Sequence, residues 1–239
     1  MLEGRSRKNN PFAAYHSDVE RMPAVDSYRT LKGPGESQMT EKKSRFLGHC
    51  VPVSSREDAL GFIAEKKAAF RDANHNVSAY YIREGNYNHS SDDGEPSGTA
   101  GLPVLEIIQK GGLTDAVIVV TRYFGGTLLG TGGLKRAYSA AAAAAVKAAG
   151  IAVMTRCALY DLQTPYPLYE PVLKLLSGAG ARVLHTDFAE SVSLRCVVRE
   201  GSKGILLEAV KELSRGGITP LQSEEGFFPL DDFEPSEAN

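Results

Sequence analysis

The pattern of apolar and polar positions predicts two successive groups of strands and helices. In the first group, runs rich in apolar and β-branched residues have the length of strands and cover residues 45–53, 77–83 and 116–121. The third run is apolar throughout, which is typical of a strand covered on both faces. Residues 86–98, between the second and third runs, are rich in Asn, Asp, Ser and Gly, so we expect a loop there.

Two helices are predicted in this first group. Ser54 and Glu57 have the spacing of a capping box, so a helix is expected to begin there. Its predicted buried face consists of Leu60, Ile63 and Phe70. The second helix covers residues 134–149 and contains six consecutive alanines, which favour a helix and allow close packing on a sheet. Gly150 follows it at the position of a C-terminal cap.

The second group alternates in the order strand, helix, strand, strand, helix, strand. The predicted elements cover residues 156–163, 166–177, 182–188, 191–198, 203–213 and 218–222. This order is the split βαβ, or ferredoxin-like, plan. We therefore predict an α+β protein with four parts: a flexible N-terminal tail over 1–25, a first domain over 26–150, a ferredoxin-like domain over 151–228, and an acidic tail over 229–239.

Composition agrees with two compact domains. The chain has 239 residues, of which 42% are hydrophobic and 23% charged, and this supplies enough apolar material for two cores. The cysteines at 50, 157 and 196 are odd in number and widely spaced, so neither a disulfide framework nor a zinc site is expected. We find no signal peptide, and the longest weakly apolar run, 137–154, is interrupted by Lys147. These features predict a cytoplasmic protein with no membrane contact.

Charge is distributed unevenly along the chain. Residues 26–150 carry 15 basic and 13 acidic side chains, whereas 151–239 carry 8 basic and 13 acidic side chains. A protein that coats nucleic acid without sequence preference needs many cations that no acid compensates. This balance excludes extensive coating of nucleic acid, so any contact with RNA is expected to be local.

The most distinctive segment is a glycine-rich stretch between the strand at 116–121 and the alanine-rich helix. Glycines let successive backbone N–H groups converge on an anion, and a following helix start adds positive potential. We therefore assign candidate RNA- or phosphate-binding residues to it: Arg122, Tyr123, Gly125, Gly126, Gly130, Gly132, Gly133, Lys135 and Arg136. The alternative stays open that the glycines only turn a strand into a closely packed helix while the cations are solvated.

Two further candidates lie upstream of this segment. Asp92, Asp93 and Glu95 stand in a turn-rich stretch. Hard cations prefer carboxylate oxygens, but the spacing of these three residues matches no calcium loop. A structural role in ordering the loop is therefore favoured over a metal site. His75 precedes a strand and could donate to a phosphate or base, or act as a general acid. No nucleophile is paired with it in the sequence, so we assign no catalytic residue, metal or cofactor.

Three motifs together resemble the IMPACT family, in its bacterial YigZ-like branch. They are SDDGEPSGTAG at 91–101, VVTRYFGG at 119–126 and LLGTGGLKRAY at 128–138. The resemblance extends over most of 28–150 and is weaker in the second domain. It implies that the first domain has the α/β, ribosomal-protein-like fold of domain four of elongation factor G, and that the second is ferredoxin-like, as is domain five of that factor.

Two positions depart from the family pattern. Val77 stands where members commonly have cysteine, and Leu128 stands where many have lysine, so a thiol and a loop cation are missing. Eukaryotic members regulate translation and carry an additional N-terminal interaction domain, for which residues 1–25 are too short.

The leading hypothesis is a noncatalytic, translation-associated regulator that contacts RNA or the ribosome through its glycine-rich, arginine-containing loop. The family resemblance supports this role only by analogy with the translation factor. One alternative is a small-molecule phosphotransferase whose glycine-rich loop holds nucleotide phosphates. Another is a regulator that binds a protein partner in translation control without contacting nucleic acid.

Overall fold

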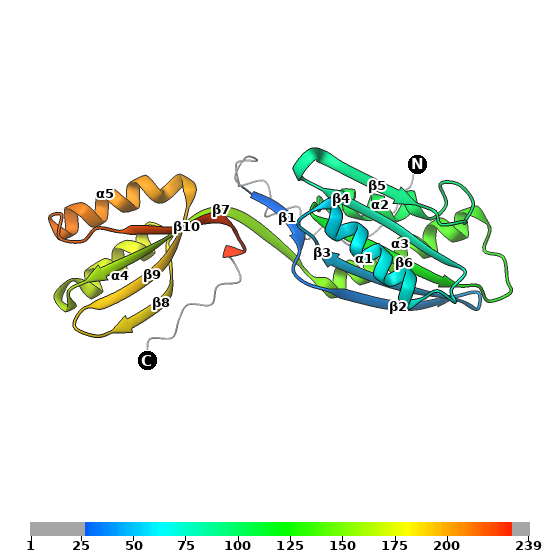
Figure 1. Cartoon of the computed structure of the whole chain (residues 1–239), viewed down its shortest axis with the longest axis horizontal. Coiled ribbons are helices and arrows are strands. Elements are labelled where there is room, and N and C mark those ends of the chain that lie inside the picture. Colours follow the sequence, from blue (N-terminus) through cyan, green and yellow to red (C-terminus); the bar gives the residue numbers. More distant parts are fainter. Residues whose placement is uncertain (1–26, 231–239) are drawn as a thin grey trace, which may run out of the picture. The chain divides into compact units, whose positions relative to one another are not determined.

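The computed structural model describes residues 27–230, which form two compact units (Figure 1). The first unit covers 29–152, and the second consists of 153–230 together with residues 27 and 28. The predicted tail at 1–25 and residues 231–239 of the predicted acidic tail lie outside the described residues. Leu230, also assigned to that tail, is buried beside Cys157, Leu159 and Val197. No helix within 27–230 is long and apolar enough to cross a membrane.

The first unit is built on a five-stranded antiparallel sheet with the order β2-β3-β6-β4-β5. The central strand β6 is buried over nearly its whole length, as its continuous apolar run predicts. The strands are β2 (Gly35–Glu41), β3 (Ser44–Pro52), β4 (His75–Ile82), β5 (Tyr87–Ser91) and β6 (Ala116–Tyr123). The helices are α1 (Arg56–Ala69), α2 (Gly101–Lys110) and α3 (Gly130–Ala149), with a short 3-10 helix at Glu84–Asn86.

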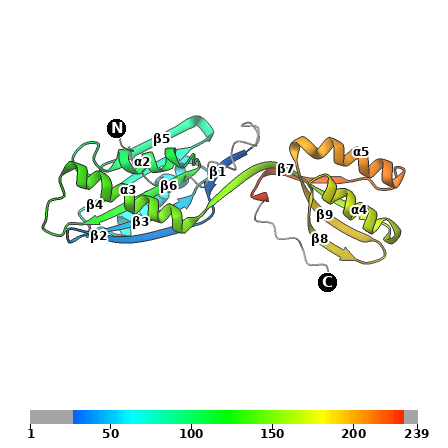
Figure 2. The same ribbon diagram turned by 180° about the vertical axis from the view of Figure 1, so that it is seen from behind.

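Helices cover both faces of this sheet. Helix α1 packs on one face, where Ala59 and Ile63 meet Tyr80, Val117 and Val119 (Figure 1). Helices α2 and α3 lie on the opposite face, which is nearer the viewer in Figure 2. The alternation of side chains along β4 and β6 therefore divides the unit into two cores. The larger core lies between the sheet and the α2–α3 pair.

The alanine-rich helix α3 packs against the backbone of the sheet without intervening side chains. A Cβ placed on Gly48 would lie 2.7 Å from the carbonyl oxygen of Ala141, and one placed on Gly35 would lie 2.6 Å from Cβ of Ala149. The small side chains on both surfaces permit this approach. Ser37 adds a hydrogen bond from its Oγ to the Ala141 carbonyl oxygen, at 2.8 Å.

The second unit has the βαββαβ order that the sequence predicts. Its antiparallel strands have the order β10-β7-β9-β8, and β1 (Ser27–Leu31) also neighbours β7. Helices α4 and α5 pack on the sheet through Val172, Leu176, Leu206 and Val210. The elements are β7 (Ile151–Thr164), α4 (Tyr166–Gly178), β8 (Arg182–Phe188), β9 (Val192–Arg199), the short 3-10 helix Glu200–Ser202, α5 (Lys203–Ser214) and β10 (Leu221–Phe228). The α+β fold class is confirmed.

Several details of the predicted secondary structure are wrong. The predicted loop at 86–98 contains β5, an edge strand whose polar residues show no apolar alternation. The last strand, predicted at 218–222, begins at Leu221 and continues to Phe228 because it follows its partner β7 rather than an apolar run. Helix α3 begins at Gly130, four residues before the predicted start, so three glycines of the expected loop belong to the helix.

The predicted start and buried face of α1 also need correction. The capping box joins Ser55 and Asp58, one residue later than predicted: Ser55 Oγ accepts from the Asp58 N–H, and Oδ2 of Asp58 accepts from the Ser55 N–H. Leu60 is 44% exposed and does not belong to the buried face. Ala59 and Ile63, four residues apart, share the buried face of α1, and Leu60 lies to the side of it.

Candidate functional site

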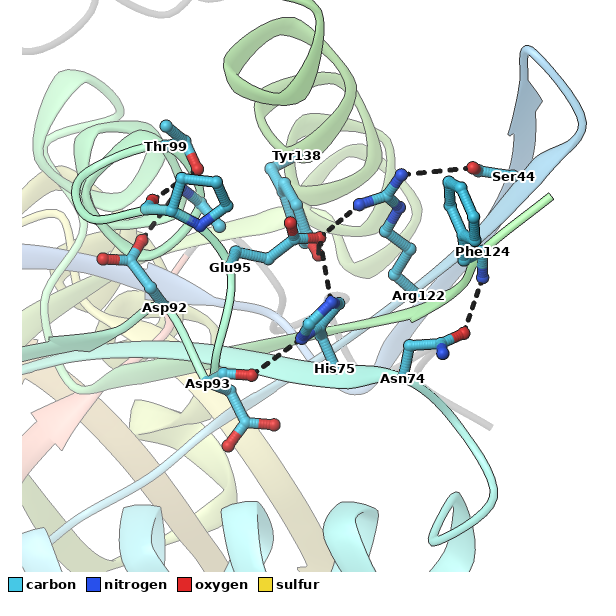
Figure 3. A network of polar contacts seen from close by, with 12 residues as sticks. Ser44, Asn74, His75, Asp92, Asp93, Glu95, Thr99, Arg122, Phe124 and Tyr138 are labelled. Atoms are coloured by element: carbon cyan, nitrogen blue, oxygen red, sulfur yellow. Dashed lines mark hydrogen bonds and ion pairs between the residues drawn. The ribbon is translucent and has the colours of Figure 1, made fainter. Parts of the chain in front are cut away.

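The antiparallel register of the first sheet gathers several candidate residues at one end of its central strands. Arg122, near the end of β6, lies opposite His75 of β4 on one side and Phe46 of β3 on the other. Ser44 begins β3, two residues from Phe46. Residues far apart in the sequence therefore surround the end of β6, where the glycine-rich segment begins (Figure 3).

A buried ion pair between Arg122 and Glu95 forms the centre of this region. Arg122 donates from Nη1 to Oε1 of Glu95 at 2.6 Å, and their side chains are only 6% and 3% exposed. Tyr138 of α3 donates its hydroxyl to the same Glu95 oxygen at 2.7 Å. Burial raises the pKa of Tyr138, and the bond to Glu95 raises it further. Arg122 also donates from Nη2 to Oγ of Ser44 at 3.3 Å, so its guanidinium group is held on two sides.

His75 joins this network from β4. Its Nδ1 lies 2.8 Å from the carbonyl oxygen of Asp93, which can only accept, so Nδ1 carries the proton of this hydrogen bond. Its Nε2 lies 3.7 Å from Oε1 of Glu95. His75 thus connects the acidic loop to the Arg122–Glu95 pair (Figure 3).

The carboxylates of Asp92 and Asp93 order the acidic loop. Asp92 accepts hydrogen bonds from the backbone N–H groups of Gly98, Ala100 and Gly101, at the start of α2. Burial raises the pKa of Asp92, but these three donors outweigh burial and leave the pKa below its usual value.

Asp93 contacts α1 and β4. It accepts from Nζ of Lys67 and from the backbone N–H of Asn76, both at 2.7 Å. Burial raises the pKa of Asp93, but these donors lower it overall. Within residues 27–230, no group of three His, Cys, Asp or Glu side chains is arranged to hold a metal ion.

The segment that follows β6 is fixed at its start by side chains from β3 and from the loop before β4. The N–H of Phe124 donates to Oδ1 of Asn74 at 2.7 Å, and the N–H of Gly125 donates to Oγ of Ser44 at 3.2 Å. Tyr123 bonds Asp72 through its hydroxyl, at 3.0 Å.

Close packing also fixes the segment at Gly125. This residue lies directly on the β2–β3 turn: a Cβ there would be 2.0 Å from both C and O of Lys43. Gly125 is therefore required by this contact rather than by a positive φ angle.

The start of α3 carries the remaining candidate residues. No side chain caps its first turn, whose N-cap residue is Leu129, and the turn contains no acidic residue. Gly130, Gly132 and Gly133 lie in this turn, and Lys135 and Arg136 follow it with exposed side chains. Within the described chain, neither cation forms a salt bridge. The uncapped N–H groups and these two cations give the end of the helix a positive potential.

A pocket of about 440 Å³ lies between the start of α3 and the Arg122–Glu95 pair. Its apolar lining includes Phe124 and Leu128, which are 44% and 82% exposed. The ring of Phe124 lies 5.4 Å from the guanidinium carbon of Arg122. The other lining residues are Asn74, His75, Glu95, Pro96, Arg122, Leu129, Gly130, Thr131 and Leu134.

The structure therefore separates the candidate residues into two sets. His75, Glu95 and Arg122 lie together and line the pocket, and Lys135 and Arg136 are exposed on α3. Asp92 and Asp93 support the loop from outside the pocket lining, and Tyr123 is engaged by Asp72 and by Arg45, whose Cζ lies 4.5 Å from the ring centre. Several residues of the site were not predicted from the sequence, among them Ser44, Asn74, Phe124, Leu129 and Tyr138. Only Tyr138 had a usable signal, because it lies four residues after Leu134 on the same helix face.

Comparisons with known proteins agree with the family resemblance. The model of the Impact N-terminal domain matches residues 42–146, and that of a domain of unknown function (DUF1949) matches 162–216. IMPACT family member YvyE of Bacillus subtilis is 36% identical over 193 residues, covering 80% of this chain and 89% of the relative. IMPACT family member YigZ of Escherichia coli is 32% identical over 187 residues, covering 77% and 92%.

Two further comparisons agree with this assignment. Protein IMPACT of Xenopus laevis is 33% identical over 123 residues, covering 48% of this chain and 36% of that protein. A crystal structure of a hypothetical protein has a TM-score of 0.54 and 30% identity, and the match covers 84% of this chain and 98% of that one. The predicted resemblance is confirmed by near full-length relatives, and the chain belongs to the IMPACT family.

Proposed function

We propose that this chain is a noncatalytic, translation-associated protein that contacts RNA through the segment joining β6 to α3. The observation that carries the proposal is the uncapped start of α3, which opens beside the exposed ring of Phe124 and is followed by exposed Lys135 and Arg136. Backbone N–H groups at a helix start attract phosphate, and aromatic rings stack on bases. Together they offer the two kinds of contact that a nucleic acid needs.

Buried and exposed candidates have different roles in this proposal. Arg122 is buried and bonded to Glu95 and Ser44, so its charge is compensated and its role is to position the segment from beneath. Lys135 and Arg136 are free to reach phosphates. Tyr123 is engaged by Asp72 and supports the segment at its start.

The number of cations limits the expected contact. Besides Lys135 and Arg136, exposed cations close to the segment are Lys42 and Lys43, in the turn against which Gly125 packs, and Arg45, whose Cζ lies 4.5 Å from the Tyr123 ring centre. Such a set neutralises on the order of two to four phosphates, so affinity for RNA should fall with salt along a shallow slope. This local contact agrees with the near balance of charge in residues 26–150.

Fluorescence anisotropy with a short labelled RNA at several salt concentrations tests the proposal. The variant Lys135→Ala/Arg136→Ala should weaken binding and reduce the salt slope by about two phosphates. The matched control is Lys147→Ala/Lys174→Ala, which removes two exposed cations at the far end of α3 and in the second unit. Equal losses in both variants, or no binding by the wild-type protein, would overturn RNA contact at this site.

The link with translation has its own measurement. If the protein works on translating ribosomes or their RNA, it should co-sediment with ribosomal particles when cell extract is centrifuged through a density gradient. The variant Lys135→Ala/Arg136→Ala should instead stay at the top of the gradient. Sedimentation that is the same in wild type and variant would contradict this part. Saturable, Arg122-dependent ATP binding and consumption without RNA binding would instead favour a phosphotransferase.

A further inference from the structure

The pocket beside the start of α3 has a size and an apolar lining that nonspecific phosphate binding would not require. Its volume of about 440 Å³ falls within the range of small-molecule sites, ~300–1,000 Å³. We propose that it holds one unpaired nucleotide, with the base against Phe124 and the neighbouring leucines and the phosphate on the N–H groups of the first turn of α3. This inference rests on the proposed RNA contact and names the part of the RNA that is recognised.

The apolar side of the pocket suits the base. Phe124, Leu128 and Leu129 form a continuous apolar wall, yet Leu128 is 82% exposed and Phe124 is 44% exposed. One aromatic ring with an open face is the usual platform for a single base. The guanidinium group of Arg122 lies 5.4 Å from the Phe124 ring centre, and Asn74 bonds the Phe124 N–H, so the backbone that carries the ring is fixed before a ligand arrives.

The start of α3 lies at the edge of this largely apolar pocket and suits a phosphate. Gly130 and Thr131 line it and lie in the first turn of α3, which has neither a side-chain cap nor an acidic residue. A second, independent observation comes from Arg122: its Nε is buried and has no hydrogen-bond partner among residues 27–230, although the side chain lines the pocket and is 5% exposed as a residue. An unsatisfied buried donor of a cation favours an anion nearby.

Gly132, next to the pocket-lining Thr131, is exposed in the first turn of α3. A Cβ at this position would meet only the flexible end of Arg136, at 3.5 Å, so the fold leaves room for alanine there. Alanine is also the better helix former. A glycine that packing does not require leaves the backbone of the first turn open to a bound group.

The geometry favours an unpaired nucleotide over a base pair. A base inside a duplex is stacked on both faces and cannot present a face to Phe124 unless it leaves the helix. A pocket of this size takes one base. We therefore expect recognition of a loop, bulge or chain end of RNA, rather than of continuous double-stranded RNA.

The test uses the full-length protein and short RNAs that carry 2-aminopurine, whose fluorescence reports stacking of the base. Single-stranded RNA should bind at least about tenfold more tightly than a duplex of equal length, with a change in 2-aminopurine fluorescence. Phe124→Leu keeps an apolar side chain without the ring, and should weaken single-strand binding about tenfold while leaving the salt slope unchanged. The control Tyr166→Leu removes an exposed aromatic ring of the second unit and should change nothing.

A pair of glycine variants tests the phosphate side. Gly132→Ala should raise the melting temperature and yet weaken binding several-fold, because the added methyl group covers the first turn. Gly61→Ala, in the interior of α1 where a Cβ meets nothing within 4 Å, should raise the melting temperature without changing binding. If Gly132 had only a structural role, Gly132→Ala would not raise the melting temperature while weakening RNA binding.

The outcomes separate this inference from the proposed function. Equal affinity for single strand and duplex, with Phe124→Leu and Gly132→Ala binding as wild type, would overturn the nucleotide pocket and leave RNA contact through Lys135 and Arg136 standing. Phe124-dependent binding of free AMP without binding of RNA would overturn the RNA-binding function and assign the pocket to a free nucleotide. Binding of neither RNA nor AMP would overturn both.

Discussion

Arg122 and Glu95, which lie 27 positions apart in the sequence, form a 2.6 Å ion pair that is almost completely buried at the end of the central strand β6. The hydroxyl of Tyr138 bonds the same carboxylate oxygen, so one acidic side chain ties together β6, α3 and the acidic loop. The sequence suggests that Arg122 is available to bind phosphate, but in the fold its guanidinium group is already paired with Glu95. Its removal should therefore affect both the fold and the pocket.

Glu95→Gln should lower the free energy of unfolding by about 3 kcal/mol, since breaking a buried ion pair leaves an uncompensated charge. Urea denaturation followed by circular dichroism measures this change. Glu106→Gln is the control, because Glu106 pairs with Lys110 on an exposed surface and such pairs contribute little, at most about 0.5 kcal/mol. A loss below about 1 kcal/mol in Glu95→Gln would show that the pair is not important for stability.

Asp92→Asn should remove part of the acid sensitivity of the protein. The pKa of Asp92 is lowered in the fold, so its carboxylate stabilises the protein above the pKa of the unfolded chain, about 3.9, and this contribution is lost as the pH falls through the folded value. The stability difference between wild type and variant should be largest at pH 6 and shrink below about pH 4. A difference that does not change with pH would contradict this role.

His49→Phe should reduce the loss of stability between neutral and mildly acidic pH. Burial, followed by the charge of Lys66, lowers the pKa of His49 below 6.5, against the opposing effect of Glu36. The fold therefore holds the neutral ring, whose contribution is fully present above pH 6.5 and declines as the pH falls below it.

Phenylalanine keeps the stacking on Phe70, whose ring centre lies 5.1 Å from that of His49. Unfolding in urea at pH 7.5 and pH 5 gives the comparison, with the exposed His89→Gln as control. Equal pH dependence in wild type and His49→Phe would refute this explanation.

Gly125→Ala should destabilise the first unit by about 3 kcal/mol, because the new methyl group would overlap the backbone of Lys43, which cannot move without disturbing the β2–β3 turn. Gly61→Ala should stabilise by about 0.5–1 kcal/mol, as expected for a glycine in a helix interior with open space around it. Thermal unfolding of both variants measures the two changes in stability, which should have opposite signs. A neutral Gly125→Ala would mean that the turn can shift.

Elements with a strong local pattern could be predicted from the sequence. The apolar run of β6, the alanines of α3 and the alternation of the second unit each identify an element without knowledge of its partners. Strand β5 could not be found in this way, because its polar residues owe their conformation to pairing with β4 at the sheet edge. Its hydrogen bonds are made with β4, and the residues of β5 alone give no sign of that pairing.

The site was predicted only in part, for the same reason. The glycine-rich segment and His75 stand out by composition, but the pairing of Arg122 with Ser44 spans 78 positions and depends on the register of β3 and β6. A charged residue suggests an exposed side chain, and only the fold shows that Arg122 is buried. Phe124 and Leu129 line a pocket because the segment between β6 and α3 lies against Asn74, His75 and Glu95, a relationship that no motif records.

The contact of α3 with the backbone at Gly35 and Gly48 restricts how the pocket can respond to a ligand. Alanines have no side-chain rotamers, so this interface cannot repack in small steps, and tilting the helix would separate it from the sheet or drive it into the backbone. The first turn of α3 is therefore preorganised, and binding costs little conformational entropy there. Adjustment to a ligand is therefore left to exposed side chains on the opposite wall, such as Leu128, while the helix stays in place.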